Sequence, residues 1–156
     1  MKRWGVYLVL IAAASFLNIT PFSGVDIAKL APVEVVWLEQ QNGMVSLETD
    51  TGEHGVGATI QEALTDMRKS ASADVFLKTA NYLIVKQGSE VLISETYEHF
   101  RPNCILCAAG EKPEMKDTLP FLRAHKPELT LRQWRVLETE LPILMEKEGR
   151  YEWLAE

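Results

Sequence analysis

A strong hairpin signal lies in the stretch Val33-Glu-Val-Val-Trp-Leu-Glu-Gln-Gln-Asn-Gly-Met-Val-Ser-Leu-Glu-Thr49. Its first part is β-branched and aromatic, and Met44–Thr49 alternates with the two-residue period of a strand. Asn42 and Gly43, between the two parts, both tolerate a positive φ angle, which is typical of a tight hairpin turn. The stretch therefore predicts an antiparallel β-hairpin.

Two capping boxes predict helix starts further along the chain. In Thr59-Ile-Gln-Glu62 the Thr59 hydroxyl can accept the Glu62 amide, and the Glu62 carboxylate can accept the Thr59 amide. Apolar residues at helical spacing behind this box predict a helix to about Ser70. Thr130-Leu-Arg-Gln133 has the same pattern and predicts a short helix towards Glu138.

The remaining elements are short apolar runs and one-sided apolar patterns. Asp50–Gly57 has three glycines and predicts a loop or a bulged strand end. The other predicted elements are strands at Val75–Leu77, Tyr82–Val85 and Cys104–Ala109, helices over Glu90–Phe100 and from Pro113 to Leu122 with a distortion at Pro120, and a closing hairpin of Ile143–Met145 and Tyr151–Leu154 around Glu148-Gly149. The order β-β-α-β-α-β-α-α-β-β predicts an α/β or α+β fold with a single mixed sheet covered by helices.

The first residues of the chain have the pattern of an export segment. Lys2 and Arg3 precede an apolar run from Trp4 to Leu17, which extends to Phe22 if two polar residues are tolerated. Such a segment is typical of a signal peptide or a signal anchor, and the positive-inside rule places the rest of the chain outside the cytoplasm. A buried N-terminal helix of a soluble domain is the alternative.

We therefore expect residues 1–23 to be a signal peptide or signal anchor and residues 24–156 to be one extracytoplasmic α/β domain. The domain would be anchored by residues 4–22 at the outer face of the cell membrane, or secreted if the segment is cleaved. The formal net charge is −6, and removing Lys2 and Arg3 takes it to −8. This acidic balance argues against nucleic acid as a partner and against electrostatic adhesion to anionic lipid.

Several segments together resemble a known family. They are Asp26-Ile-Ala-Lys-Leu30, the hairpin, Gly57-Ala-Thr-Ile-Gln-Glu-Ala-Leu64, Ala73-Asp-Val-Phe-Leu-Lys-Thr-Ala-Asn-Tyr-Leu-Ile-Val85, Phe100-Arg-Pro-Asn-Cys-Ile-Leu-Cys-Ala-Ala-Gly110 and Glu140-Leu-Pro-Ile143. Over residues 24–154 they resemble the N-terminal domain of the C-subunit lipoproteins of spore germinant receptors, the Ger(x)C family.

The chain also departs from that family. It has no lipobox cysteine, its Ala58 and Pro102 stand where the family more often has lysine and aspartate, and the later domains of the full-length subunit are absent from this sequence. The resemblance implies a membrane-associated extracytoplasmic domain without known catalysis. It implies partners among other membrane or envelope proteins.

Cys104-Ile-Leu-Cys107 is the one constellation that points to an enzymatic reaction. In thiol–disulfide enzymes the Cys-x-x-Cys spacing works at a helix N-terminus, where both sulfur atoms lie on one side. If this segment is a strand, positions i and i+3 point to opposite faces of the sheet. The pattern favours buried free thiols, with a redox pair and a structural disulfide as alternatives.

Other candidate sites have weaker patterns. A zinc site would need two further ligands beside the two cysteines; His99 and His125 are the nearest histidines in the sequence, and neither has the paired spacing of a zinc finger. Asp50-Thr-Gly-Glu-His54 could hold a cation or act in acid–base chemistry, but a solvated loop explains it as well. We therefore expect a non-enzymatic exported binding domain that uses no cofactor and no metal. A redox protein using Cys104 and Cys107 is the alternative, and an exported domain whose binding surface no motif reveals is the third possibility.

Overall fold

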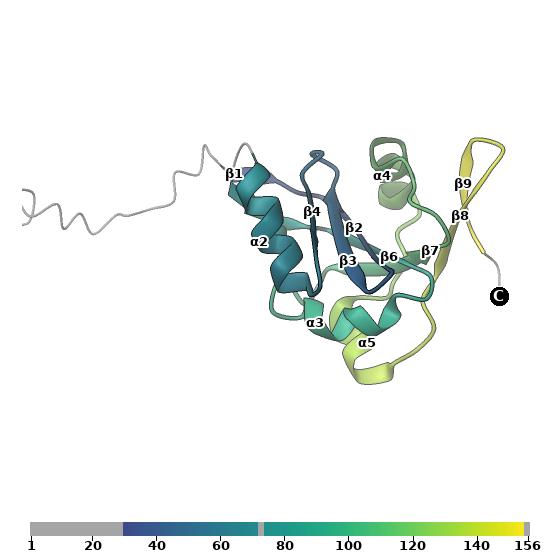
Figure 1. The fold of residues 1–156 in the computed structure, drawn as a ribbon. Helices are drawn as coiled ribbons and strands as arrows, with labels where there is room; N and C mark the ends of the chain where they lie inside the picture. The colour runs from purple at the N-terminus through teal and green to yellow at the C-terminus, as the bar shows by residue number, and fades with distance from the viewer. Residues whose placement is uncertain (1–29, 72–73, 155–156) are drawn as a thin grey trace, which may run out of the picture.

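The computed structural model describes residues 30–71 and 74–154. In this part of the chain the strands form a seven-stranded sheet of order β4-β3-β2-β6-β7-β8-β9 and a separate β1-β5 pair (Figure 1). The elements are β1 (Leu30–Pro32), β2 (Val35–Gln41), β3 (Met44–Thr49), β4 (His54–Gly57), α2 (Ile60–Ser70), β5 (Asp74–Phe76), the 3₁₀ turn η2 (Leu77–Thr79), β6 (Tyr82–Lys86), the 3₁₀ turn η3 (Glu90–Leu92), α3 (Ile93–Thr96), β7 (Ile105–Ala109), α4 (Met115–Ala124), α5 (Leu131–Leu137), β8 (Ile143–Lys147) and β9 (Arg150–Trp153).

The large sheet is mixed. Its central strands β2, β6, β7 and β8 are parallel, while β3 and β4 at one side and β9 at the other are antiparallel to their neighbours. The predicted α/β class with a mixed sheet flanked by helices is confirmed. The β1-β5 pair is additional to the single sheet that the sequence predicts.

Helices cover both faces of the sheet. Because side chains alternate along a strand, Val36 and Leu38 of β2 pack towards α2, α3 and α5, whereas Val35 and Trp37 pack towards α4. The central strands are buried on both sides, as parallel strands in a layered α/β fold are. On the α4 side, the Tyr82 hydroxyl donates to the Leu122 carbonyl at 3.3 Å and ties the helix to β6.

Both predicted hairpins are confirmed. Gln41 and Met44 face each other across the first turn, where Asn42 has φ 54° and Gly43 has φ 77°. Positive φ at both turn positions matches the right-handed twist of the two strands, so this turn sets their register. The closing hairpin has the same geometry at Glu148 and Gly149.

The two predicted capping boxes differ in outcome. The Thr130 box is complete, because Gln133 N donates to Thr130 Oγ1 and Thr130 N donates to Gln133 Oε1. At the start of α2 the Glu62 amide donates to Thr59 Oγ1 at 3.2 Å, as predicted. The Glu62 carboxylate, however, accepts from the Ala58 amide at 2.9 Å, one residue earlier than predicted.

Three predicted boundaries are wrong in part. Asp50–Gly57 forms a turn followed by the regular strand β4. The helix predicted over Glu90–Phe100 is only the turn η3 and the four residues of α3, followed by a turn in which the His99 and Phe100 amides both donate to the Thr96 carbonyl. Helix α4 begins at Met115, two residues after Pro113, and contains Pro120 as predicted.

The apolar segment of residues 4–22, the domain boundary at residue 24 and residues 26–29 of the first segment of the family resemblance lie outside the described residues. Among residues 30–71 and 74–154, no helix combines the length and the apolar character that crossing a membrane requires.

Candidate binding site

The connections after β6 and β7 leave the sheet on opposite faces. After β6 the chain passes to η3 and α3, whose buried side chains pack with α2, and after β7 it passes to α4 on the other face. In open α/β sheets, ligands bind at the carboxyl ends of parallel strands where neighbouring connections part in this way. The topology therefore singles out the ends of β6 and β7, at Gln87 and Gly110.

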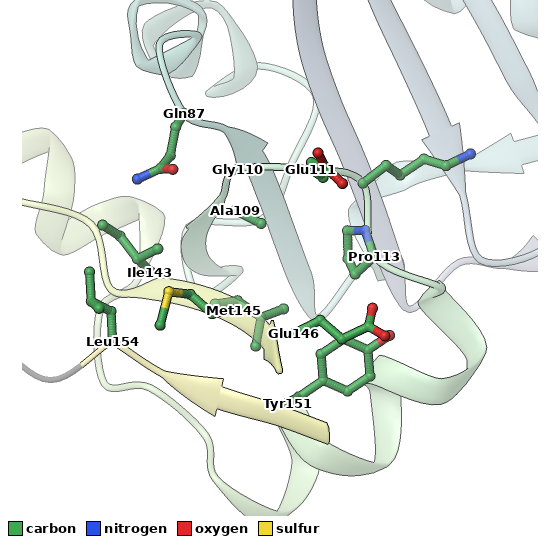
Figure 2. Close-up of a pocket in the computed structure, with 12 residues that line it drawn as sticks. Gln87, Ala109, Gly110, Glu111, Pro113, Ile143, Met145, Glu146, Tyr151 and Leu154 are labelled. Carbon is green, nitrogen blue, oxygen red and sulfur yellow. The ribbon is translucent and has the colours of Figure 1, made fainter. Parts of the chain in front are cut away.

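A cleft lies at this position, bounded on its other side by the β8–β9 hairpin (Figure 2). We call it the sheet-end cleft; its volume is about 340 Å³. Its apolar surface comes from the end of β7 and from β8, and polar side chains of the loops and of β9 stand around it. The lining includes Gln87, Ala109, Gly110, Glu111, Lys112, Pro113, Ile143, Leu144, Met145, Glu146, Tyr151 and Leu154.

The cleft exists because β7 and β8 pair over only two positions. Their ladder runs from Ala108↔Ile143 to Ala109↔Leu144, after which the chain turns away at Gly110 while β8 continues. At the other end of β7, the Leu106 amide donates to the Leu129 carbonyl, so the segment before α5 occupies the place next to β7. The second half of β8 is thus left beside the cleft.

A second hollow of about 320 Å³ adjoins the sheet-end cleft on the α5 side. Gln87 and Ile143 line both, and Trp134 and Leu141 supply apolar surface to the second. Three apolar side chains of η3 and the end of α5, the elements that flank this hollow, are largely exposed: Val91 at 72%, Val136 at 77% and Leu137 at 65%.

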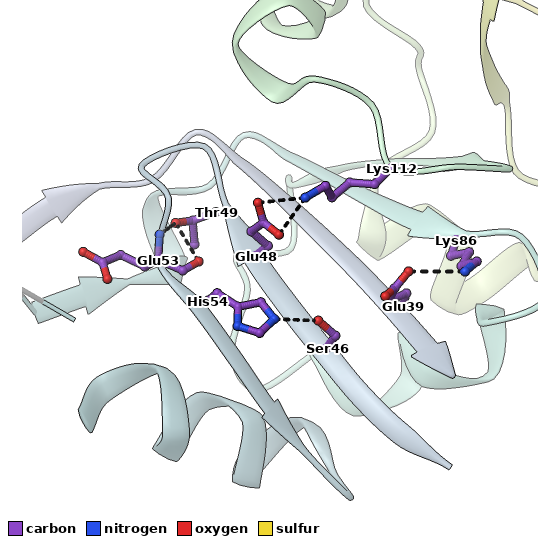
Figure 3. Close-up of polar contacts among 8 residues, drawn as sticks. All are labelled: Glu39, Ser46, Glu48, Thr49, Glu53, His54, Lys86 and Lys112. Atoms are coloured by element: carbon purple, nitrogen blue, oxygen red, sulfur yellow. Dashed lines mark hydrogen bonds and ion pairs between the residues drawn. The ribbon is translucent and has the colours of Figure 1, made fainter. Parts of the chain in front are cut away.

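Two ion pairs join the end of β6 and the loop after β7 to neighbouring strands (Figure 3). Lys112 Nζ lies 2.9 Å and 3.0 Å from the two carboxylate oxygens of Glu48 on β3. Lys86 at the end of β6 lies 3.3 Å from Glu39 on β2. Partly exposed pairs of this kind contribute little to stability. They connect the end of β6 and the loop after β7 to strands on the other side of the sheet.

The chemistry of the cleft suits binding. Glu111 and Glu146 are exposed carboxylates near its rim, Gln87 offers an amide, and Tyr151 offers a hydroxyl. Pro113 and Leu144 are buried beneath them. An apolar floor with a few polar groups around it is the usual composition of a binding surface.

The structure separates the two cysteines. Both are free and buried, with Cys104 in the core on the α2 side and Cys107 in the core on the α4 side. Burial raises the pKa of Cys104 to about 12, and it raises the pKa of Cys107 further. A redox pair needs accessible, adjacent sulfur atoms and a thiolate, and this arrangement provides none of these.

We expect both thiols to be unreactive in the folded protein. Ellman's reagent should label neither cysteine of the full chain at pH 8 and should label both in 8 M urea.

The raised thiol pKa values also make stability depend on pH. A thiol pKa that is raised in the folded state means that, as the pH rises, the thiol of the unfolded chain loses its proton first. The free energy of unfolding should therefore hold below the ordinary thiol pKa of 9.0 and fall as the pH rises above it. The expected slope is about 1.4 kcal/mol per pH unit for each thiol.

The control is the double variant Cys104→Ala/Cys107→Ala, whose stability should fall less steeply above pH 9. Rapid labelling of one cysteine in the native chain would contradict the buried positions of both.

The other candidate residues lie apart from one another. His99 is close to Arg68 and Lys78, and burial, with those two cations, lowers its pKa. His125 stacks on Phe121 at the end of α4, with 4.9 Å between ring centroids. In the described ranges, no group of three or more His, Cys, Asp or Glu side chains is positioned to hold a metal ion.

The Asp50–His54 segment is used by the fold. Asp50 Oδ1 accepts the Glu34 amide at 3.1 Å, and His54 Nε2 lies 3.2 Å from Ser46 Oγ on the neighbouring strand (Figure 3). The side chains of Asp50 and His54 thus contact different parts of the fold, Asp50 the Glu34 backbone and His54 the Ser46 side chain.

Sequence reasoning missed the residues of the sheet-end cleft. Gln87 and Gly110 directly follow the predicted strands Tyr82–Val85 and Cys104–Ala109, so the signal was present. The position of these residues at strand ends identifies the cleft only if the strands are known to be parallel neighbours, and sequence patterns did not supply that order.

No family model, no curated protein and no solved structure matches this chain.

Proposed function

We propose that this chain is a non-enzymatic binding domain, exported and held at the outer face of the cell membrane by residues 4–22, or secreted if that segment is cleaved. Its partners are other membrane or envelope proteins. This is the role that the resemblance to the N-terminal domain of germinant-receptor C subunits implies. The acidic net charge of −6 also argues against nucleic acid.

One observation carries the binding part of the proposal. The sheet-end cleft and the second hollow adjoin at the carboxyl ends of β6 and β7, where two ion pairs join the end of β6 and the loop after β7 to neighbouring strands. Sites that are largely formed before binding lose less conformational freedom when a partner docks. Because the Cys104 and Cys107 thiols are separated and buried, binding is the function that this geometry supports best.

The experiment is site-specific crosslinking in cells that express the full chain. A photoreactive benzoylphenylalanine replaces Met145, which lines the cleft, and in a control chain it replaces Lys126, an exposed residue beyond α4. We expect a discrete adduct with an envelope protein from position 145 and none from position 126.

Two outcomes would count against the proposal. One is the same set of adducts from both positions, which indicates random collision. The other is recovery of the uncleaved chain in the soluble cytoplasmic fraction, which is incompatible with export.

A further inference from the structure

The outer edge of the large sheet is formed by β9, the last strand in its order. The Leu154 amide donates to the Ile143 carbonyl, so these two residues form a hydrogen-bonded pair between β8 and β9. Such pairs alternate along an antiparallel ladder, and the register makes Met145↔Glu152 and Lys147↔Arg150 the next ones. The peptide groups of Tyr151 and Trp153 must therefore point away from β8, towards the free edge.

The side chains next to these peptide groups are charged and of opposite sign. Arg150 and Glu152 lie on one face of β9 and are exposed, whereas Tyr151 and Trp153 pack towards Phe121 of α4 on the other face. Glu152 has a long contact of 4.0 Å with Lys147. Within the described ranges, Arg150 has no ion-pair partner.

These charges select one register for a second copy of the strand. In an antiparallel β9–β9 pair, hydrogen bonds join the residues whose peptide groups point to the free edge, Tyr151 and Trp153. The twofold axis of such a pair therefore passes through position 151, 152 or 153. With the axis at 152, Glu152 would face Glu152 of the other copy, and with the axis at 153, Glu152 would face Leu154. Only the axis at Tyr151 places Arg150 opposite Glu152, and symmetry then produces this ion pair twice.

We propose that two copies of this chain associate through β9 in this register and form a continuous fourteen-stranded sheet. The backbone N–H of Tyr151 in each copy donates a hydrogen bond to the Tyr151 carbonyl of the other copy across the axis. Arg150 of each copy forms an ion pair with Glu152 of the other. The interface is isologous, which is the usual form of a homodimer. The two α4 helices then lie on the same face of the joined sheet. The proposal does not depend on the sheet-end cleft or on export.

Charge reversal tests the register, using the full chain purified in detergent and sedimentation equilibrium. Arg150→Glu or Glu152→Arg replaces two attractive contacts by two repulsive ones, and cross-strand charge pairs contribute roughly 0.2–1 kcal/mol each. Each single variant should raise the dimer dissociation constant by about tenfold or more. The double variant Arg150→Glu/Glu152→Arg restores both pairs and should return the dissociation constant to within about threefold of the starting value.

Arg132→Glu on α5 is the matched control, since it makes the same charge change on an exposed residue of another element and should leave the dissociation constant unchanged. A monomeric starting protein overturns the proposal. So does a double variant that dissociates as readily as either single variant.

Disulfide trapping gives a second measurement that is independent of affinity. In the proposed register, positions 150 and 152 of different copies form a pair without hydrogen bonds, with Cα atoms about 4.5 Å apart, which a disulfide can span. Mixing Arg150→Cys with Glu152→Cys chains under mild oxidation should give mainly the mixed dimer. Equal yields from either variant alone would overturn the register.

Discussion

Gly55→Ala is expected to destabilise the fold by about 3 kcal/mol or more, because the added methyl group has no space. A Cβ atom at Gly55 would lie 2.1 Å from the Ala63 carbonyl oxygen and 2.7 Å from Met67 N, both in the backbone of α2. Backbone atoms cannot rotate away as a flexible side chain can, so α2 must move off β4. Urea unfolding followed by far-UV circular dichroism measures the loss.

The matched control is Gly110→Ala. There the nearest atom is Gln87 Oε1 at 3.2 Å, at the end of a flexible side chain, and we expect a change of less than about 1 kcal/mol. If both alanine variants unfold at the same urea concentration, the close contact between β4 and α2 is wrong.

Leu83→Ala is expected to cost about 2–5 kcal/mol, the usual range for removing a fully buried leucine side chain. Leu83 is 0% exposed on β6, the middle strand of the large sheet, and it packs in the core between the sheet and α2. The truncation leaves a cavity that rigid neighbouring strands on both sides cannot close. The free energy of unfolding from urea titration is again the measurement.

Leu137→Ala provides the comparison for the same change of side chain. Leu137 is 65% exposed at the end of α5, and its truncation should change the free energy of unfolding by about 0.5 kcal/mol or less. A loss at Leu137 equal to that at Leu83 would show that Leu83 is not in the core.

Local patterns predicted the elements whose cause is local. The Asn42-Gly43 turn and the Thr130 capping box depend on residues within a few positions of one another, and both form as predicted. The opposite faces of Cys104 and Cys107 also follow from a local rule, the two-residue period of a strand.

Long-range pairing explains what sequence patterns missed. Strand β4 is regular because α2 packs against its glycines and because Asp66 accepts the Val56 amide at 3.2 Å, ten residues away. The β1-β5 pair joins segments more than 40 residues apart. The sheet-end cleft depends on the connections after β6 and β7 leaving on opposite faces, which no local pattern shows.

The same distinction applies to function. The Cys-x-x-Cys spacing suggests redox chemistry only where both sulfur atoms lie on one side of a helix start. Here Cys104 directly precedes the interior strand β7 and Cys107 lies on it, and the same spacing places the two side chains in two different cores. What the fold offers instead is the pair of hollows at the sheet end, on which the proposed binding role rests.

If the chain is an exported binding domain, its C-terminus lies outside the cytoplasm, and a pair of reporter fusions measures this. An alkaline phosphatase reporter, which is active only outside the bacterial cytoplasm, is fused after Glu156, and a parallel chain carries a green fluorescent reporter that folds in the cytoplasm. We expect high phosphatase activity with little fluorescence, and loss of the phosphatase activity when residues 4–22 are deleted. Strong fluorescence with little phosphatase activity from the intact chain would contradict it.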